Sequence, residues 1–178
     1  MSTRAVRWSF GGIIDAQSVR ATASVPTASS GYDGGKKVPG RKRHIVTDTL
    51  GLLLAVAVTA ANMGDRDAAV PLLRQLPSLH REITLLWADG GYTGGLVGWT
   101  KEKLELTLEV VKRTDDMTGF VVLPRRWVVE RTFAWLMQSR RLTRDYETLT
   151  ATSEAMIQWS MITRMSRRLA RPRAHGRH

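Results

Sequence analysis

The sequence predicts a single mixed α/β domain, and three observations lead to this fold class. The chain has 178 residues, enough for one ordinary domain with a hydrophobic core and too few for two. Apolar runs typical of buried strands alternate along it with segments whose apolar residues recur at helical spacing. The expected order of elements is β, β, β, α, β, α, β, α, α, a pattern typical of a mixed sheet flanked by helices.

The first three strands are expected before residue 62. Residues 13–19 (IIDAQSV) begin with β-branched side chains and then turn polar, which indicates a short buried strand closed by Asp15. Residues 40–62 hold two apolar runs around TDTLG. This pattern predicts a β-hairpin with Asp48 and Gly51 in its turn.

The middle of the chain alternates between helix and strand. Residues 64–78 show helical spacing, and Asp65 and Asp67 near their start are interpreted as acids that interact with the helix dipole. Residues 83–94 (ITLLWADGGYTG) read as a buried strand that stops sharply at Asp-Gly-Gly. Two shorter elements follow, a helix over 96–103 and a strand over 104–113.

Two helices are expected at the C-terminal end, over 124–142 and Ser153–Leu169. The first opens with a proline, which is favoured in the first turn of a helix. At 100° per residue, Glu130 falls at the edge of an apolar arc that faces the core. The arc consists of Val129, Phe133, Leu136 and Met137, and Trp127 and Trp135 are also expected to be buried.

Composition favours a soluble, cytoplasmic protein that binds polyanions. The formal net charge is +11 and there is no cysteine, which excludes disulfides and thiolate metal sites. The longest nearly unbroken apolar stretch, over 50–61, is too short to span a bilayer. Residues 34–44 form either a solvated entry to the hairpin or a loop that grips phosphates. Their five basic residues are Lys36, Lys37, Arg41, Lys42 and Arg43.

Three acids could form a metal site. Singly, Asp15 and Asp89 could satisfy turn amides, and Glu130 could pair with Arg126 one helical turn before it. Drawn together, their carboxylates would repel one another unless a cation lay between them. Oxygen ligands favour Mg²⁺ or Mn²⁺, and two such ions can clamp the attacking and leaving oxygens of a phosphoryl displacement.

Four stretches carry a resemblance to a known family: IIDAQSV, GYDGGKKVPGRKRHIVTDTLGLLLAV, ADGGYTG and LPRRWVVERTFAWL. Together they resemble bacterial insertion-sequence transposases of the DDE class, specifically the insertion-sequence-five-like group, from about Gly12 to Arg168. The resemblance implies a ribonuclease H-like fold that binds two Mg²⁺ (or Mn²⁺) ions. It also implies an enzyme that cuts DNA at insertion-sequence ends and joins the freed strands to target DNA.

The resemblance also assigns individual residues. By position, Asp15, Asp89 and Glu130 are the catalytic, metal-binding triad. Arg126 matches the arginine of the glutamate motif, whose tyrosine is replaced here by Leu123. Met137 stands where the family has a basic residue, and Arg140 and Arg141 could substitute for it. The predicted DNA-binding residues are therefore Arg126, Arg140 and Arg141, together with the five of the loop over 34–44.

The predicted organisation has three parts: an unmatched segment over 1–11, the catalytic domain over 12–169 and a basic tail over 170–178. The family's N-terminal helical region has no match in the first part. We therefore expect a possible partner polypeptide from an upstream reading frame, besides DNA and further copies of the chain, and no membrane. Two alternatives stay open: a truncated, inactive nucleic-acid-binding remnant, and a ribonuclease H-like nuclease.

Overall fold

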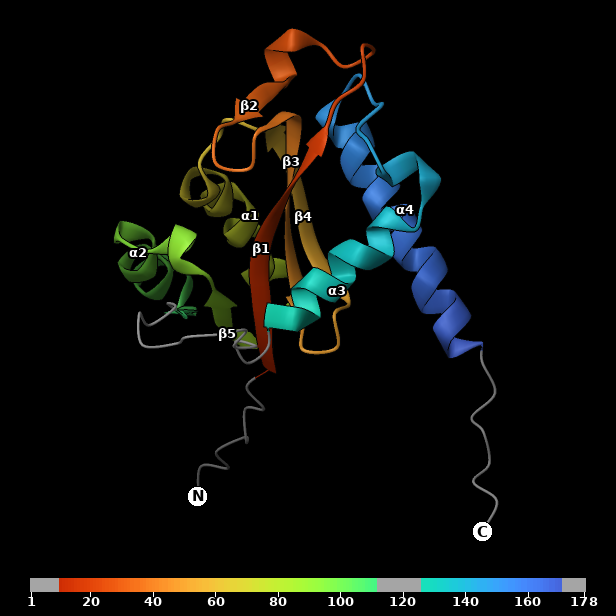
Figure 1. The fold of residues 1–178 in the computed structure, drawn as a ribbon. Helices are drawn as coiled ribbons and strands as arrows, with labels where there is room; N and C mark the ends of the chain where they lie inside the picture. Colours follow the sequence, from red (N-terminus) through yellow and green to blue (C-terminus); the bar gives the residue numbers. More distant parts are fainter. Residues whose placement is uncertain (1–9, 112–125, 171–178) are drawn as a thin grey trace, which may run out of the picture.

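A sheet between two layers of helices makes up the computed structural model, which describes residues 10–111 and 126–170 (Figure 1). Within these ranges the sheet has six strands. The strands are β1 (Phe10–Arg20), β2 (Gly31–Asp33), β3 (Val38–Asp48), β4 (Leu53–Ala60), β5 (Ile83–Ala88) and β6 (Thr107–Val110). The helices are α1 (Asp65–Leu79), α2 (Gly95–Leu104), α3 (Arg126–Met137) and α4 (Thr150–Leu169).

Strand β1 lies at the centre of the sheet. It pairs antiparallel with β3 on one side and parallel with β5 on the other. Beyond β5 lies the parallel strand β6, and β3 also pairs with β4 and with the short β2. The predicted order of strands and helices is confirmed, with β2 as an addition. The predicted hairpin is β3–β4, whose turn is closed by Asp48 Oδ1 accepting from the amides of Leu50 and Leu52.

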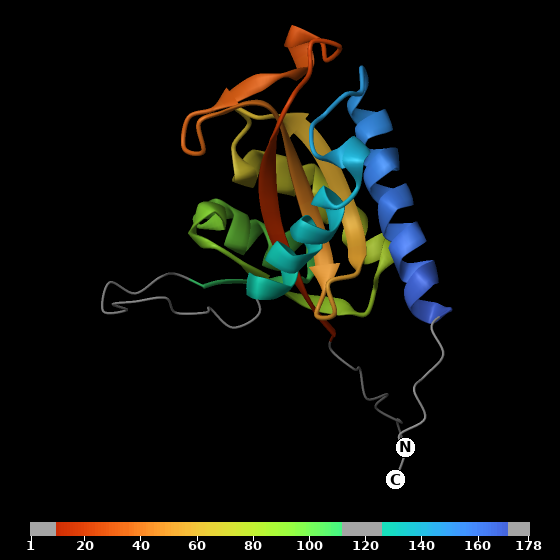
Figure 2. The same cartoon turned by 45° about the vertical axis from the view of Figure 1, so that its right-hand side comes forward.

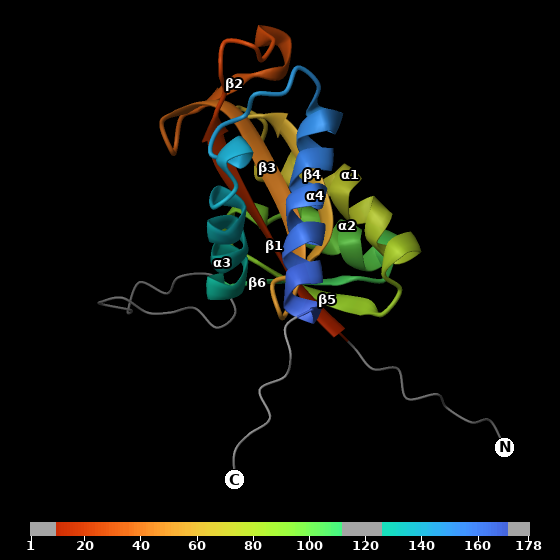
Figure 3. The same cartoon turned by 90° about the vertical axis from the view of Figure 1, so that its right-hand side faces the viewer.

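Each face of the sheet has its own core, because successive strand side chains point to opposite faces. Ile14 and Val46 pack with buried residues of α1 and α2. Ile13 and Ile45 pack with buried residues of α3 and α4 on the other face. Figures 1 and 2 show α3 lying across β1 while α4 runs along β4, and Figure 3 shows α4 from its outer side. No helix in the described ranges is long and apolar enough to cross a membrane.

Two predictions about local structure were wrong. Asp15 does not close its strand: β1 continues to Arg20 because its polar end pairs with β3, for example Gln17 with Arg43. Trp127 is not buried, since 49% of it is exposed. The buried face of α3 instead includes Val128 and Thr132, in addition to the predicted Val129, Phe133 and Leu136.

The limits of the predicted domain lie close to the described elements. Strand β1 begins at Phe10, two residues before the predicted start at residue 12, and α4 ends at Leu169 as expected. Leu123, Pro124 and almost all of the predicted tail over 170–178 lie outside the described residues.

Candidate active site

One surface hollow of about 460 Å³ is lined by Asp15, Asp89 and Glu130. The parallel pairing of β1 and β5 sets Ile13 opposite Trp87. Asp15 lies two residues beyond the first of these and Asp89 two beyond the second, so both acids lie at the same level on neighbouring strands. Glu130 comes from α3, which packs against β1.

The alternation of side chains along β1 decides where Asp15 points. Ile14 faces the core beneath α1 and α2, whereas Ile13 faces the core beneath α3 and α4. Asp15 therefore shares the face of Ile13, on the side of the helix that carries Glu130. Its side chain is half-buried, and its Oδ1 accepts a hydrogen bond from the amide of Ala16 at 2.7 Å.

Asp89 follows β5 directly, and the next residues hold its carboxylate in place. Gly90–Tyr92 form a single 3₁₀ turn, and Asp89 Oδ1 accepts from the amide of Gly91 at 2.9 Å. The stop predicted at Asp-Gly-Gly is confirmed. This capping bond fixes the carboxylate relative to the end of the strand.

Glu130 is exposed on a helix that is otherwise firmly anchored. Two residues of the same helix, Val129 next to Glu130 and Leu136 six positions after it, are fully buried. The tip of the β3–β4 hairpin also contacts the helix, because Thr132 Oγ1 donates to the carbonyl of Gly51 at 2.8 Å. Burial and this bond fix the backbone of α3 while the carboxylate of Glu130 remains in the hollow.

Asp65 is a fourth acid of the hollow, and the sequence did not single it out as such. It is the first residue of α1, so its interpretation as a helix-start acid also fits the structure. Its Oδ1 lies 3.0 Å from Nζ of Lys42, which lies 3.8 Å from Oδ2 of Asp33. In the sequence, an acid at the start of a helix looks the same whether or not it also lines a site. Only the fold shows that Asp65 does.

Tyr92 shows that the negative charges converge. It is buried, and its hydroxyl has no hydrogen-bond partner among the described residues. Burial raises the pKa of Tyr92 well above its usual value, and the charges of Asp15, Asp65 and Asp89 raise it further. Three carboxylates are thus near enough to act on one buried atom. The only hint of this in the sequence was that the tyrosine of ADGGYTG follows Asp89 by three residues.

The basic residues of the predicted phosphate-gripping loop divide into two groups. Lys36 lines the hollow, and its Nζ donates to the carbonyl of Ala16 at 2.9 Å. Lys37 is exposed in the turn between β2 and β3. Arg41, Lys42 and Arg43, in contrast, are buried in β3, with exposed fractions of 0%, 7% and 1%.

The prediction that Arg41, Lys42 and Arg43 contact DNA is therefore corrected. The guanidinium of Arg41 forms an ion pair with Asp145 at 3.2 Å, and Arg43 donates to the carbonyl of Leu142 at 2.7 Å. Burial lowers the pKa of Arg43 to about 10. Arg41 and Arg43 thus tie β3 to the segment between α3 and α4, while Lys42 donates to the carbonyl of Met63 at 3.0 Å and pairs with Asp65. All three side chains are engaged within the protein.

The remaining predicted DNA contacts lie away from the hollow or outside the description. Arg140 and Arg141 are exposed in the 3₁₀ turn after α3, and neither lines the hollow. Arg141 Nε donates to Glu147 Oε1 at 2.9 Å, and this bond raises the pKa of Arg141. Arg126 begins α3, but its side chain is not among those that the structure describes.

A divalent cation fits the chemistry of the hollow. Its four carboxylates offer oxygen ligands, which Mg²⁺ and Mn²⁺ prefer. The charges of Asp15, Asp65 and Asp89 also raise the pKa of the buried Tyr92, so these three acids lie on the same side of the hollow as its hydroxyl. Within residues 10–111 and 126–170, however, no group of three acidic or histidine side chains is drawn close enough to hold one ion. The carboxylates would have to move together to share it.

Comparison with known proteins identifies the family to which this chain belongs. Residues 11–165 match the family described as the transposase DDE domain, and the chain therefore belongs to this family. It is similar to a Burkholderia cepacia protein named "Putative transposase for insertion sequence element IS402", with 34% identity over 116 residues. The alignment covers 61% of this chain and 54% of the relative, so the chain spans about half the length of that protein.

A solved structure gives independent support for the fold. The catalytic core domain of BIV integrase matches 87% of this chain over 82% of its own length, with a TM-score of 0.50 and 16% sequence identity. At this identity the likeness concerns the fold alone. The ribonuclease H-like fold predicted from the sequence is confirmed by this match and by the mixed sheet flanked by helices.

Proposed function

We propose that the protein is a DNA transposase that cuts and joins DNA strands by metal-dependent phosphoryl transfer. The observation that carries the proposal is the convergence of Asp15, Asp89 and Glu130 on one hollow, in a chain of the DDE transposase family. The net charge of +11 supports a polyanionic substrate. The substrates are the ends of an insertion sequence and target DNA, and the active form is an oligomer on DNA.

Each acid has a distinct part in the proposed site. Asp15, on the central strand, and Asp89, at the end of β5, supply ligand oxygens from fixed backbone positions. Glu130 supplies a third from the anchored helix α3. Two bound Mg²⁺ or Mn²⁺ ions would supply the positive charge that stabilises the attacking and leaving oxygens.

Basic side chains position the substrate in this proposal. Lys36 lies in the hollow, where an ammonium group can contact a phosphate next to the scissile one. Lys37, Arg126, Arg140 and Arg141 would contact the DNA backbone further away. In this proposal, an upstream polypeptide supplies the recognition of specific ends.

The test is strand cleavage of DNA that carries the element's ends, in Mg²⁺, with and without the upstream polypeptide. We expect Glu130→Gln to reduce cleavage to background, because the substitution removes one anionic ligand of the cation. The matched control is Glu102→Gln on the exposed side of α2, which should cleave normally. Cleavage by the Glu130→Gln variant at the normal rate would refute the proposed role of Glu130.

Metal-dependent stabilisation gives a second readout. Mg²⁺ at ~100 times its Kd should raise the free energy of unfolding by about 2.7 kcal/mol in the unmodified protein. This increase should shrink in Glu130→Gln, whose melting temperature without metal should stay the same or rise, since like charges are fewer. Metal-dependent cleavage without joining or end specificity would indicate a nuclease, and the absence of both cleavage and joining would indicate an inactive remnant.

A further inference from the structure

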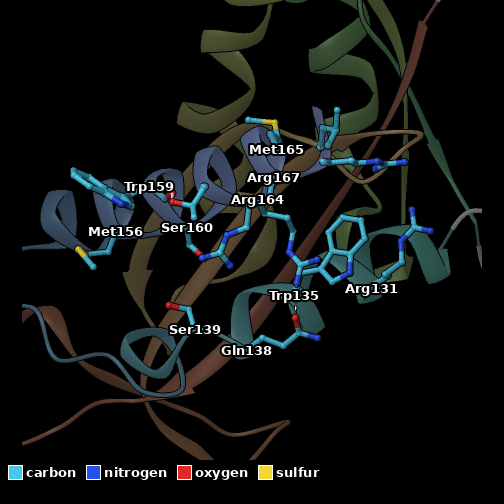
Figure 4. Close-up of a pocket in the computed structure, with 13 residues that line it drawn as sticks. Arg131, Trp135, Gln138, Ser139, Met156, Trp159, Ser160, Arg164, Met165 and Arg167 are labelled. Atoms are coloured by element: carbon cyan, nitrogen blue, oxygen red, sulfur yellow. Dashed lines mark hydrogen bonds between the residues drawn. The ribbon is translucent and has the colours of Figure 1, made fainter. Parts of the chain in front are cut away.

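A second hollow, larger than the acidic one, lies between α3 and α4. This α3–α4 groove has a volume of about 760 Å³. Figure 4 shows side chains that define it, among them Arg131, Trp135, Trp159, Arg164 and Arg167. Arg168 also lines the groove. It shares no lining residue with the acidic hollow. Helical geometry explains why, because Arg131 and Trp135 stand about 100–140° around α3 from Glu130.

Tryptophan and arginine side chains alternate along α3, and two of them, Arg131 and Trp135, line the groove. Trp127, Arg131 and Trp135 are four residues apart on α3, so they lie on one side of the helix. The guanidinium of Arg131 lies 4.4 Å from the ring centre of Trp127 and 4.8 Å from that of Trp135. Arg164 reaches from α4 to 4.8 Å from the Trp135 ring. Such cation–π contacts hold the guanidinium groups in defined positions.

The groove is positively charged. Four arginines line it, and no aspartate or glutamate is among its described lining residues. Arg167 and Arg168 are exposed in the last turns of α4. Because a second copy of the chain would bring further positive charge, electrostatics disfavour self-association here. A polyanion is the complementary partner.

The exposed aromatic side chain of Trp159 indicates that this polyanion is a single nucleic-acid strand rather than a duplex. Trp159 is 73% exposed at the groove. A duplex hides the faces of its bases by stacking them on one another, whereas an unpaired strand offers them to an aromatic ring. A basic groove with exposed aromatic rings is the combination by which proteins bind single strands.

We propose that the α3–α4 groove binds an unpaired DNA strand, with a base stacked on Trp159 and phosphates held by Arg164, Arg167 and Arg168. The identification of the polyanion as DNA rests on the proposed function. Glu130 and Arg131 are adjacent on α3, so a strand leaving the groove across this helix arrives at the acidic hollow. The groove would thereby hold one strand of an opened DNA end beside the catalytic acids.

The test compares binding of a labelled single-stranded oligonucleotide and of its duplex to the full chain, in EDTA so that no cleavage occurs. Trp159→Ala should lower affinity for the single strand about tenfold, which corresponds to ~1.4 kcal/mol. Its affinity for the duplex should remain unchanged, and Trp159→Phe should retain most single-strand binding. Because Trp159 is exposed, neither substitution should alter the melting temperature.

A pair of charge reversals tests the arginines against a matched control. Arg167→Glu with Arg168→Glu should lower single-strand affinity more than Lys101→Glu with Lys103→Glu. The control lysines are exposed on α2, which covers the opposite face of the sheet. Both double variants change the net charge by the same amount, so a difference between their single-strand affinities reports the position of the charge.

Three outcomes would overturn the inference. They are unchanged single-strand binding in Trp159→Ala, an equal loss for duplex and single strand, and equal losses in the two charge-reversal variants. Displacement of the single strand by an acidic peptide such as polyglutamate at equal charge would likewise overturn it, since bases would then contribute nothing. Absence of cleavage by the unmodified protein in Mg²⁺ counts against the proposed function alone, because the binding assay involves no cleavage.

Discussion

At the scale of single residues, the same side-chain type has opposite roles in this protein. Lys36 and Lys37 are accessible, while Arg41 and Arg43, a few positions later, are buried. The difference comes from Asp145 and the carbonyls around it, which lie more than 90 positions further along the chain. No local pattern in the sequence reports such distant partners, and this is why all five basic residues looked like DNA contacts.

Replacement of Arg41 tests this distinction. Its guanidinium donates to Asp145 and also to the carbonyls of Ser29, Glu147 and Thr148. Arg41→Met would leave a buried carboxylate and several carbonyls without their donor, so the free energy of unfolding should fall by about 3–5 kcal/mol. Urea denaturation measures this loss.

The control for Arg41 is Lys37→Met. Lys37 is exposed, so its replacement should change stability by no more than about 0.5 kcal/mol while weakening DNA binding. The Arg41 variant, measured where it remains folded, should bind DNA as the unmodified protein does. Normal stability combined with weaker DNA binding in Arg41→Met would instead support the sequence-based prediction that Arg41 contacts DNA.

At the scale of elements, the β3–β4 hairpin positions the helix that carries Glu130. The hairpin turn was predictable because Asp48 and Gly51 are typical turn residues. The contact of its tip with α3 was not predictable, since it joins Gly51 to Thr132 and Leu50 to Arg131 across about 80 residues. This contact links one end of the sheet to both the acidic hollow and the α3–α4 groove.

Gly51→Ala should disturb this link. Gly51 has φ +82°, which a residue with a side chain rarely adopts, and an added Cβ would lie 2.7 Å from Thr132 Oγ1. The left-handed conformation alone costs about 1–2 kcal/mol, and the clash pushes against α3. We expect lower stability in urea denaturation and slower cleavage in the folded fraction.

The same substitution at Gly98 provides the contrast to Gly51. Gly98 lies inside α2, and an added Cβ there would meet no atom within 4 Å. Gly98→Ala should therefore raise stability by about 0.5–1 kcal/mol, as expected for a helix interior. If both variants behave alike, the hairpin tip does not hold α3 in the way described.

At the scale of the whole molecule, most of the fold could be predicted from the sequence. Apolar periodicity is a local property, and it gave the order of strands and helices. The candidate acids Asp15, Asp89 and Glu130 were identified because each stands next to a recognisable element and motif. Asp65 and the groove were missed because their roles depend on which helices lie side by side. Trp127 in particular was expected in the core and instead stacks on Arg131.

The net charge of +11 leads to the last prediction, that duplex binding depends steeply on salt and little on base sequence. Phosphate contacts release counterions, so log K should fall linearly with log salt, with a slope of about −0.9 for each contact. With ~6–10 contacts, affinity should drop about 10³–10⁵-fold between ~50 and ~200 mM salt. For single strands the slope is about −0.7 per contact, so removing two arginine contacts in the Arg167/Arg168 variant should reduce its magnitude by roughly 1.4. Fluorescence anisotropy over a salt series, with several unrelated duplexes, measures both effects. Tight binding to one duplex that hardly changes with salt would contradict this prediction. Such binding requires contacts with base edges in a groove of the DNA, whereas the exposed basic residues of this protein are proposed to contact phosphates.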